Sequence, residues 1–195
     1  MNRYHEWKAR LTEDLEPLLS LSDPRPRISA YDHLPFAIFL YPPENEFAVQ
    51  EEAVRLATRL GNHGKRVTSV SLSACLWTAL ERDGYTLEEL TEAEKDSGWE
   101  AMAQTLHDIL RKTQPLEDLV AEQVPDGAQP EKDIVMILRA GALFPFYRTS
   151  ALLENLSGLV TVPTVLFYPG TLDGPAGLRF MGTLAPEHNY RPKIF

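Results

Sequence analysis

Three short runs of almost continuously apolar residues constrain the fold of this chain more than any other feature of its sequence. They cover residues 35–41, 134–138 and 162–168, and each leads into a stretch rich in turn-forming residues. Runs of this length without polar alternation are typical of strands covered on both faces, as in a parallel sheet between two layers of helices. The sequence therefore predicts an α/β fold.

Helical spacing fills the N-terminal part of the chain between these runs. Apolar residues recur at three- and four-residue steps over residues 4–18, and again after Asn45, which we expect to cap a helix that ends near Gly61. A second strand is expected over residues 67–72. This strand–helix–strand unit implies a parallel pair with a right-handed crossover.

The C-terminal part is expected to complete the sheet. A short helix capped by Thr149 or Ser150 leads to the last apolar run, and a turn over residues 169–174 leads to a fifth strand over 178–183 that could form a hairpin with the fourth. We therefore expect a three-layer sandwich around a largely parallel sheet of about five strands. It resembles a P-loop or Rossmann-like core, in a single α/β domain spanning residues 1–195.

Acidic side chains are concentrated in a predicted helical insert between the second and third strands. Residues 81–131 carry 14 acidic and 4 basic side chains, so the net charge of −9 arises in this segment. Breaks are expected near Gly84, Gly98 and Pro115. Negative charge disfavours direct DNA binding, because phosphate backbones attract Lys and Arg. The insert is either a solvated helical surface or a surface that meets a basic partner.

The sequence carries no motif for a catalytic, cofactor or metal site. The first strand is followed by residues 41–45, which contain no glycine for a phosphate loop, and residues 61–66 have the wrong glycine spacing and follow a helix. Cys75 lies in an apolar setting typical of a buried thiol. We therefore expect no cofactor, no metal and no enzymatic activity. The histidines are scattered singly, at His5, His33, His63, His107 and His188.

The sequence also predicts a cytoplasmic protein. Its apolar runs are far shorter than the ~20 residues that span a bilayer. The first eight residues are polar and include no apolar stretch with a cleavage site.

Two stretches at strand ends are candidates for a partner surface, because α/β folds place functional groups where strands end. They cover residues 139–148 and 168–174, and both are rich in aromatic and turn-forming residues. Alternatively they serve the fold, with Gly141 and Gly170 supplying unusual dihedral angles, aromatic rings filling the core, and Arg148 pairing with Asp173 or a helix end. The candidate surface residues are Arg139, Phe144, Phe146, Arg148, Tyr168 and Asp173.

The same stretches resemble a known family. Residues 137–148, 152–156 and 162–174, together with the closing 189–191, are similar to the BrxB family of the bacteriophage exclusion (BREX) systems. The family's counterpart of Arg148 is often followed two residues later by histidine. This chain has Ser150 there, so no role of that histidine carries over.

The resemblance implies a small accessory or core protein of anti-phage defence without established enzymatic activity. Its implied partners are other BREX proteins, notably a PglZ-type alkaline-phosphatase-like protein and a DNA methyltransferase, beside a large ATPase. We therefore predict a non-catalytic interaction scaffold. A degenerate nucleotide- or nucleic-acid-binding domain is the alternative, and an enzyme of unknown type is a third reading for which no residue stands out.

Overall fold

The computed structural model describes residues 3–29, 34–174, 177–188 and 191–195. His33, Asn189 and Tyr190 therefore lie outside the described residues, as do the side chains of residues 3–5. In the described part, no helix is long and apolar enough to cross a membrane.

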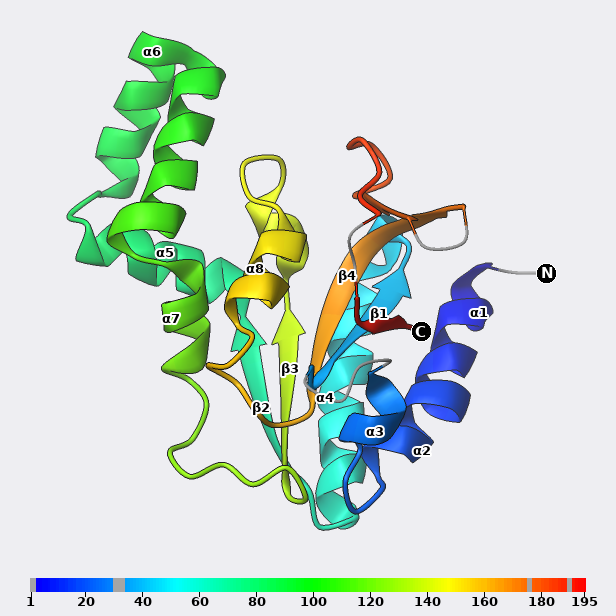
Figure 1. The fold of residues 1–195 in the computed structure, drawn as a ribbon. Coiled ribbons are helices and arrows are strands. Elements are labelled where there is room, and N and C mark those ends of the chain that lie inside the picture. The colour runs from blue at the N-terminus through cyan, green and yellow to red at the C-terminus, as the bar shows by residue number, and fades with distance from the viewer. Residues whose placement is uncertain (1–2, 30–33, 175–176, 189–190) are drawn as a thin grey trace.

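A six-stranded sheet forms the centre of the protein (Figure 1). Its strands run in the order β2-β3-β4-β1-β6, all paired in parallel, and β5 adds to β4 in antiparallel orientation. The predicted α/β fold with a mostly parallel sheet is confirmed. The strands are β1 (Phe36–Tyr41), β2 (Arg66–Ser71), β3 (Asp133–Leu138), β4 (Thr164–Asp173), β5 (Gly177–Phe180) and β6 (Lys193–Ile194).

Side chains of the central strands alternate between two buried faces, which explains the continuous apolar runs. In β1, Phe36, Ile38 and Leu40 pack into one core cluster. Phe39 and Tyr41 pack into the other. A strand with water on one face would need polar residues at alternate positions, so this pattern requires helices on both sides.

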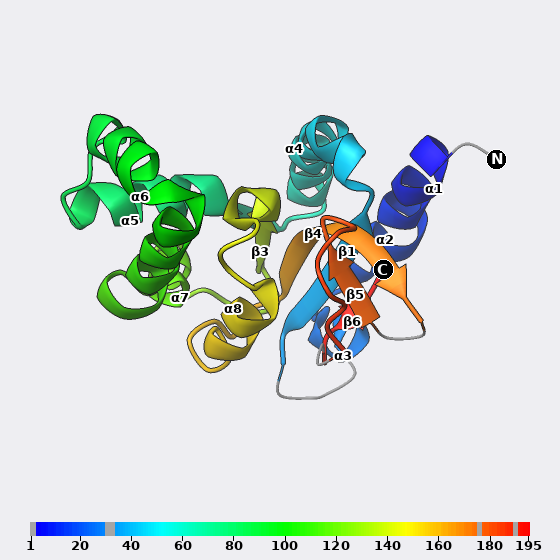
Figure 2. The ribbon, with the colours of Figure 1, turned by 90° about the horizontal axis from the view of Figure 1, so that it is seen from above.

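Helices cover both faces of the sheet (Figure 2). The N-terminal helices and α4 pack on one face, and α5, α7 and α8 pack on the other. On the first face lie α1 (Arg3–Ala9), a π-helical stretch (Arg10–Leu15), α2 (Glu16–Leu19), α3 (Arg25–Ile28), a 3₁₀ turn (Pro43–Asn45) and α4 (Glu46–Asn62). The remaining helical elements are α5 (Leu72–Arg82), α6 (Leu87–Asp108), a π-helical stretch (Ile109–Thr113), α7 (Leu116–Ala121), a 3₁₀ turn (Ala140–Leu143) and α8 (Thr149–Asn155).

The expected pairing of the first two strands is wrong. β3 and β4 lie between β1 and β2, so the connection through α4 crosses two strands. The reason lies in the residues of β2, where Thr68 and Ser69 break the apolar run and Arg66 and Ser69 are exposed. A strand as apolar as β4 is favoured at the centre of the sheet, whereas a partly polar strand such as β2 is favoured at an edge.

Three local predictions also need correction. Asn45 occupies the position before α4, but its side chain makes no capping hydrogen bond. α8 begins at Thr149 with Arg148 before it, so neither Thr149 nor Ser150 caps the helix. The expected turn at residue 169 is instead strand, because β4 continues to Asp173 before the hairpin to β5.

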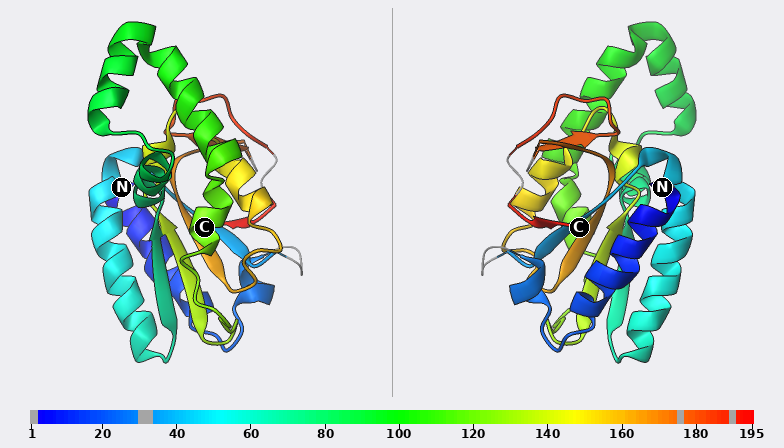
Figure 3. Two further views of the ribbon diagram at one scale, coloured as in Figure 1. Left: turned by 90° about the vertical axis from the view of Figure 1, so that its left-hand side faces the viewer. Right: turned by 90° about the vertical axis from the view of Figure 1, so that its right-hand side faces the viewer.

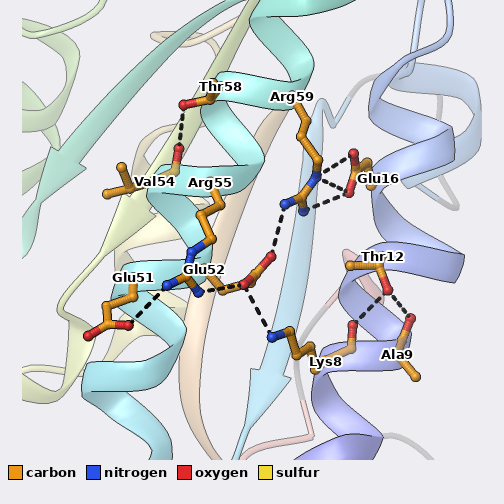
Figure 4. Close-up of polar contacts among 10 residues, drawn as sticks. All are labelled: Lys8, Ala9, Thr12, Glu16, Glu51, Glu52, Val54, Arg55, Thr58 and Arg59. Atoms are coloured by element: carbon orange, nitrogen blue, oxygen red, sulfur yellow. Dashed lines mark hydrogen bonds and ion pairs between the residues drawn. The ribbon is translucent and has the colours of Figure 1, made fainter.

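A network of ion pairs around the buried Glu52 holds the N-terminal helices against α4 (Figure 4). The Glu52 carboxylate accepts hydrogen bonds from Arg55 (3.1 Å) and Arg59 (3.0 Å) and lies 3.6 Å from the Lys8 ammonium. Arg59 also donates to both oxygens of Glu16, at 2.8–3.0 Å. Burial alone would raise the pKa of Glu52, but these cations hold its pKa below the ordinary value.

Candidate interaction surface

The loop that follows β3 and the last residues of β4 lie at one edge of the sheet, where the parallel strands have their carboxyl ends (Figure 1). The loop after β3 begins at Arg139, whose backbone adopts the left-handed conformation with φ 64°. The β4–β5 hairpin contacts this loop, since the rings of Phe144 and Phe180 form a T-shaped pair with 6.0 Å between centroids. The structure therefore brings the two predicted stretches together.

The aromatic residues of this surface differ in exposure. Phe144 and Phe146 are half-buried and pack against the core while keeping part of each ring accessible. Tyr168 is fully buried, and its ring lies 5.3 Å from that of Phe180. Phe144 and Phe146 can therefore meet a partner directly, whereas Tyr168 supports the hairpin from beneath.

The charged residues of the surface form two separate ion pairs. Arg148 donates to Glu187 at 2.9 Å, and these two residues line a surface pocket with His188. Asp173 accepts from Arg179 at 3.1 Å within the β4–β5 hairpin. The expected pairing of Arg148 with Asp173 is therefore wrong, because each residue has a nearer partner of opposite charge.

Gly170 is required for space and not for an unusual dihedral angle. Neither Gly170 nor Gly141 has a positive φ. A Cβ atom on Gly170 would lie 2.5 Å from the carbonyl oxygen of Arg179 and 2.6 Å from the Tyr168 ring. Gly170 thus allows the close approach of β5 to β4 that positions the hairpin beside the Arg139–Arg148 loop.

The acidic insert is a helical hairpin that projects past the same edge of the sheet (Figures 1 and 3). Gly98, with φ 82° and ψ 167°, interrupts α6 and separates its two arms. The predicted breaks near Gly84, Gly98 and Pro115 are confirmed. Met102 and Leu106 anchor the second arm in the core, whereas residues 91–101 are exposed.

His107 joins this hairpin to the strand-end loop. Its Nδ1 lies 2.8 Å from the carbonyl oxygen of Phe146, so Nδ1 carries the proton and donates. Its ring also lies 6.3 Å from that of Tyr147, whose pKa is raised to about 12 by burial and by the charge of Glu117. The hairpin and the loop therefore form one continuous surface.

His107 and Glu187 belong to this surface and were not among the predicted residues. The one sequence feature that could have pointed to His107 is its position next to Leu106, which belongs to the apolar stripe of the second arm. Nothing in the sequence pointed to Glu187, because its contact with Arg148 joins segments that are 39 residues apart.

The position after β1, where related folds hold phosphate, has an unsuitable chemistry here. Pro43 opens a 3₁₀ turn, and the Tyr41 hydroxyl donates to the Glu46 carboxylate at the start of α4. This carboxylate occupies the helix end that would otherwise attract an anion. Burial raises the pKa of Tyr41, so its hydroxyl stays protonated.

Lys65, the cation of the weak glycine motif at residues 61–66, is also unsuited to bind phosphate. Its ammonium donates to the backbone carbonyls of Leu21, Ser22 (3.2 Å) and Glu131 (2.8 Å). All three of its donor hydrogens can therefore be bound within the fold.

The described residues offer neither a reactive thiol nor a cluster of metal ligands. The Cys75 thiol is buried, and burial raises its pKa, which confirms the expected buried thiol and disfavours a nucleophile. Across the described ranges, no three His, Cys, Asp or Glu side chains are grouped as ligands for a metal ion.

These features define an α/β protein whose parallel sheet carries aromatic loops and an acidic helical hairpin at its carboxyl edge. A family model described as "BREX protein BrxB" matches residues 68–194. A protein named "BREX protein BrxB" from Bacillus cereus (strain H3081.97) is 34% identical over 158 residues, which cover 80% of each chain. The chain therefore belongs to the BrxB family, as the sequence resemblance predicted. No solved structure matches it significantly.

Proposed function

We propose that this chain is a non-catalytic component of a BREX anti-phage system that acts in the cytoplasm by binding other BREX proteins. Its partners under this proposal are the PglZ-type alkaline-phosphatase-like protein and the DNA methyltransferase. The observation that supports this proposal most is the continuous surface formed by the Arg139–Arg148 loop and the α6 hairpin. The two are joined by the hydrogen bond between His107 and the Phe146 carbonyl oxygen.

The composition of this surface supports the proposal. Half-buried Phe144 and Phe146 supply apolar area on a loop whose position is held by the core, and Arg148 lies beside them with a side chain 64% exposed. Aromatic residues and Arg are enriched where proteins bind one another. A loop that is already ordered loses little conformational entropy on binding.

Co-purification tests this proposal. The tagged full-length chain is expressed with all other BREX proteins of its own system, and the bound proteins are identified and quantified against a tag-only control. We expect the PglZ-type protein, the methyltransferase or both to be retained in stoichiometric amounts. Failure to retain any BREX protein would contradict the proposal.

The nucleotide-binding alternative is tested separately with the purified chain. The Glu46 carboxylate at the start of α4 and the carbonyl-bound Lys65 both oppose phosphate binding. We therefore expect no change in Tm with ATP, GTP, cyclic nucleotides or oligonucleotides. A saturable, concentration-dependent rise in Tm would favour the alternative.

A further inference from the structure

The first arm of the α6 hairpin carries acidic charge that the fold does not neutralise. Glu88, Glu92 and Asp96 are exposed, and none of the three takes part in an ion pair among the described residues. Lys95 is the one Lys or Arg between residues 83 and 110. Some acidic residues elsewhere are paired, as Glu52 is with Arg59.

The spacing of these acidic residues makes the charge self-repelling. Glu88, Glu92 and Asp96 follow one another at four-residue steps, so they lie along one side of the helix. Like charges at this spacing oppose helix formation, and solvent and salt screen them only in part. Cationic side chains placed along this side would remove the repulsion and add attraction.

Exposed apolar groups accompany these charges. Leu87 at the start of the first arm is 65% exposed, and Trp99 at the start of the second is 46% exposed. Gly98 lies between the arms with φ 82°, which places Trp99 at the turn of the hairpin. A partner that bound only by charge would leave these two side chains in water.

We propose that the α6 hairpin binds a basic amphipathic segment of another BREX protein. Lys or Arg of that segment pair with Glu88, Glu92 and Asp96, and its apolar residues cover Leu87 and Trp99. The charge complementarity selects a cationic protein segment over an acidic one. This inference rests on the proposed function and adds the site and the chemistry of the partner.

The test compares two variants of the full-length chain that lose the same number of charges. One carries Glu88→Gln, Glu92→Gln and Asp96→Asn. The matched control carries Glu13→Gln, Glu44→Gln and Glu154→Gln, which are exposed acidic residues outside the hairpin. Affinity for the co-purified BREX partner is measured at low and at high salt, and Tm is measured for each free chain.

We expect the hairpin variant to lose about tenfold in affinity at low salt and to show a weaker salt dependence, while the control stays within about twofold of wild type. Its Tm should equal or exceed that of wild type, because repulsion is relieved. Equal affinity of the hairpin variant and wild type would overturn this inference and leave the proposed function standing. A wild-type chain that retains no BREX protein would overturn both.

Discussion

The ring of His107 in the acidic insert donates a hydrogen bond of 2.8 Å to the carbonyl oxygen of Phe146 in the loop after β3. This contact joins two segments that are 39 residues apart in the sequence. The insert and the strand-end loop are therefore held in one arrangement, and a partner can contact both at once.

Replacing His107 tests this connection. His107→Leu keeps a side chain of similar size but removes the donor, which should cost about 0.5–1.5 kcal/mol of unfolding free energy. Amide hydrogen exchange in residues 99–113 and 144–148 should become faster, while exchange in β1 should not change. Unchanged exchange in both segments would show that packing alone holds the hairpin.

The Glu52 network predicts acid sensitivity. The pKa of Glu52 is lowered in the folded chain by Arg55 and Arg59 despite burial. A carboxylate whose pKa is lowered by folding stabilises the fold above its unfolded pKa, here near 4.5, and this stability is lost as pH falls through the folded pKa. Unfolding free energy should therefore decline below about pH 4.5.

Glu52→Gln provides the matching variant. It should cost about 1.5–3 kcal/mol at neutral pH, because Arg55 and Arg59 lose a charged acceptor, and it should flatten the decline at acidic pH. Denaturant titrations at several pH values measure both effects. An acid profile parallel to that of wild type would show that other carboxylates dominate, such as Asp133, whose pKa is lowered mainly by its hydrogen bond from Arg66.

Two glycines should respond in opposite directions to alanine. Gly170→Ala should destabilise the chain by about 1–3 kcal/mol, since the new methyl group would meet the Arg179 carbonyl and the Tyr168 ring. Gly61→Ala lies in α4 with nothing within 4 Å of the new atom, and should stabilise by about 0.4–1 kcal/mol. Thermal unfolding measures both, and similar shifts would contradict the close approach at Gly170.

The exposed apolar residues of the hairpin should matter for binding and not for folding. Trp99→Ser removes a side chain that is 46% exposed, so Tm should change little. Partner affinity should fall about tenfold, because exposed Trp contributes strongly where it becomes buried. Val54→Ser, on the outer side of α4 and 67% exposed, is the control and should leave affinity unchanged.

The apolar runs predicted the strands, because successive residues such as Ile134 and Val135 pack into opposite core clusters and both need a covering layer. The order of the strands was not predictable from local pattern, since β2 and β1 are separated by strands that arrive later in the chain. β6 was not predicted, because its two residues, Lys193 and Ile194, are too few to show an alternation of apolar and polar side chains.

The candidate surface was predicted in part. The aromatic and turn-forming residues indicated the chemistry of this surface, and the structure brings the loop after β3 against the β4–β5 hairpin at Phe144 and Phe180. Partners set by long-range folding were not readable, as for Arg148, which pairs with Glu187 instead of Asp173. The burial of Tyr168 could not be predicted either. Its neighbour Phe180 belongs to the β4–β5 hairpin, whose close packing depends on Gly170.

Hydrogen–deuterium exchange of the chain, alone and in complex with its co-purified BREX partner, tests the central claim most directly. The account predicts new protection in residues 87–101 of the hairpin and 139–148 of the loop, with α4 unchanged. Protection confined to α4 or to the N-terminal helices, with the hairpin and loop exchanging as in the free chain, would contradict it.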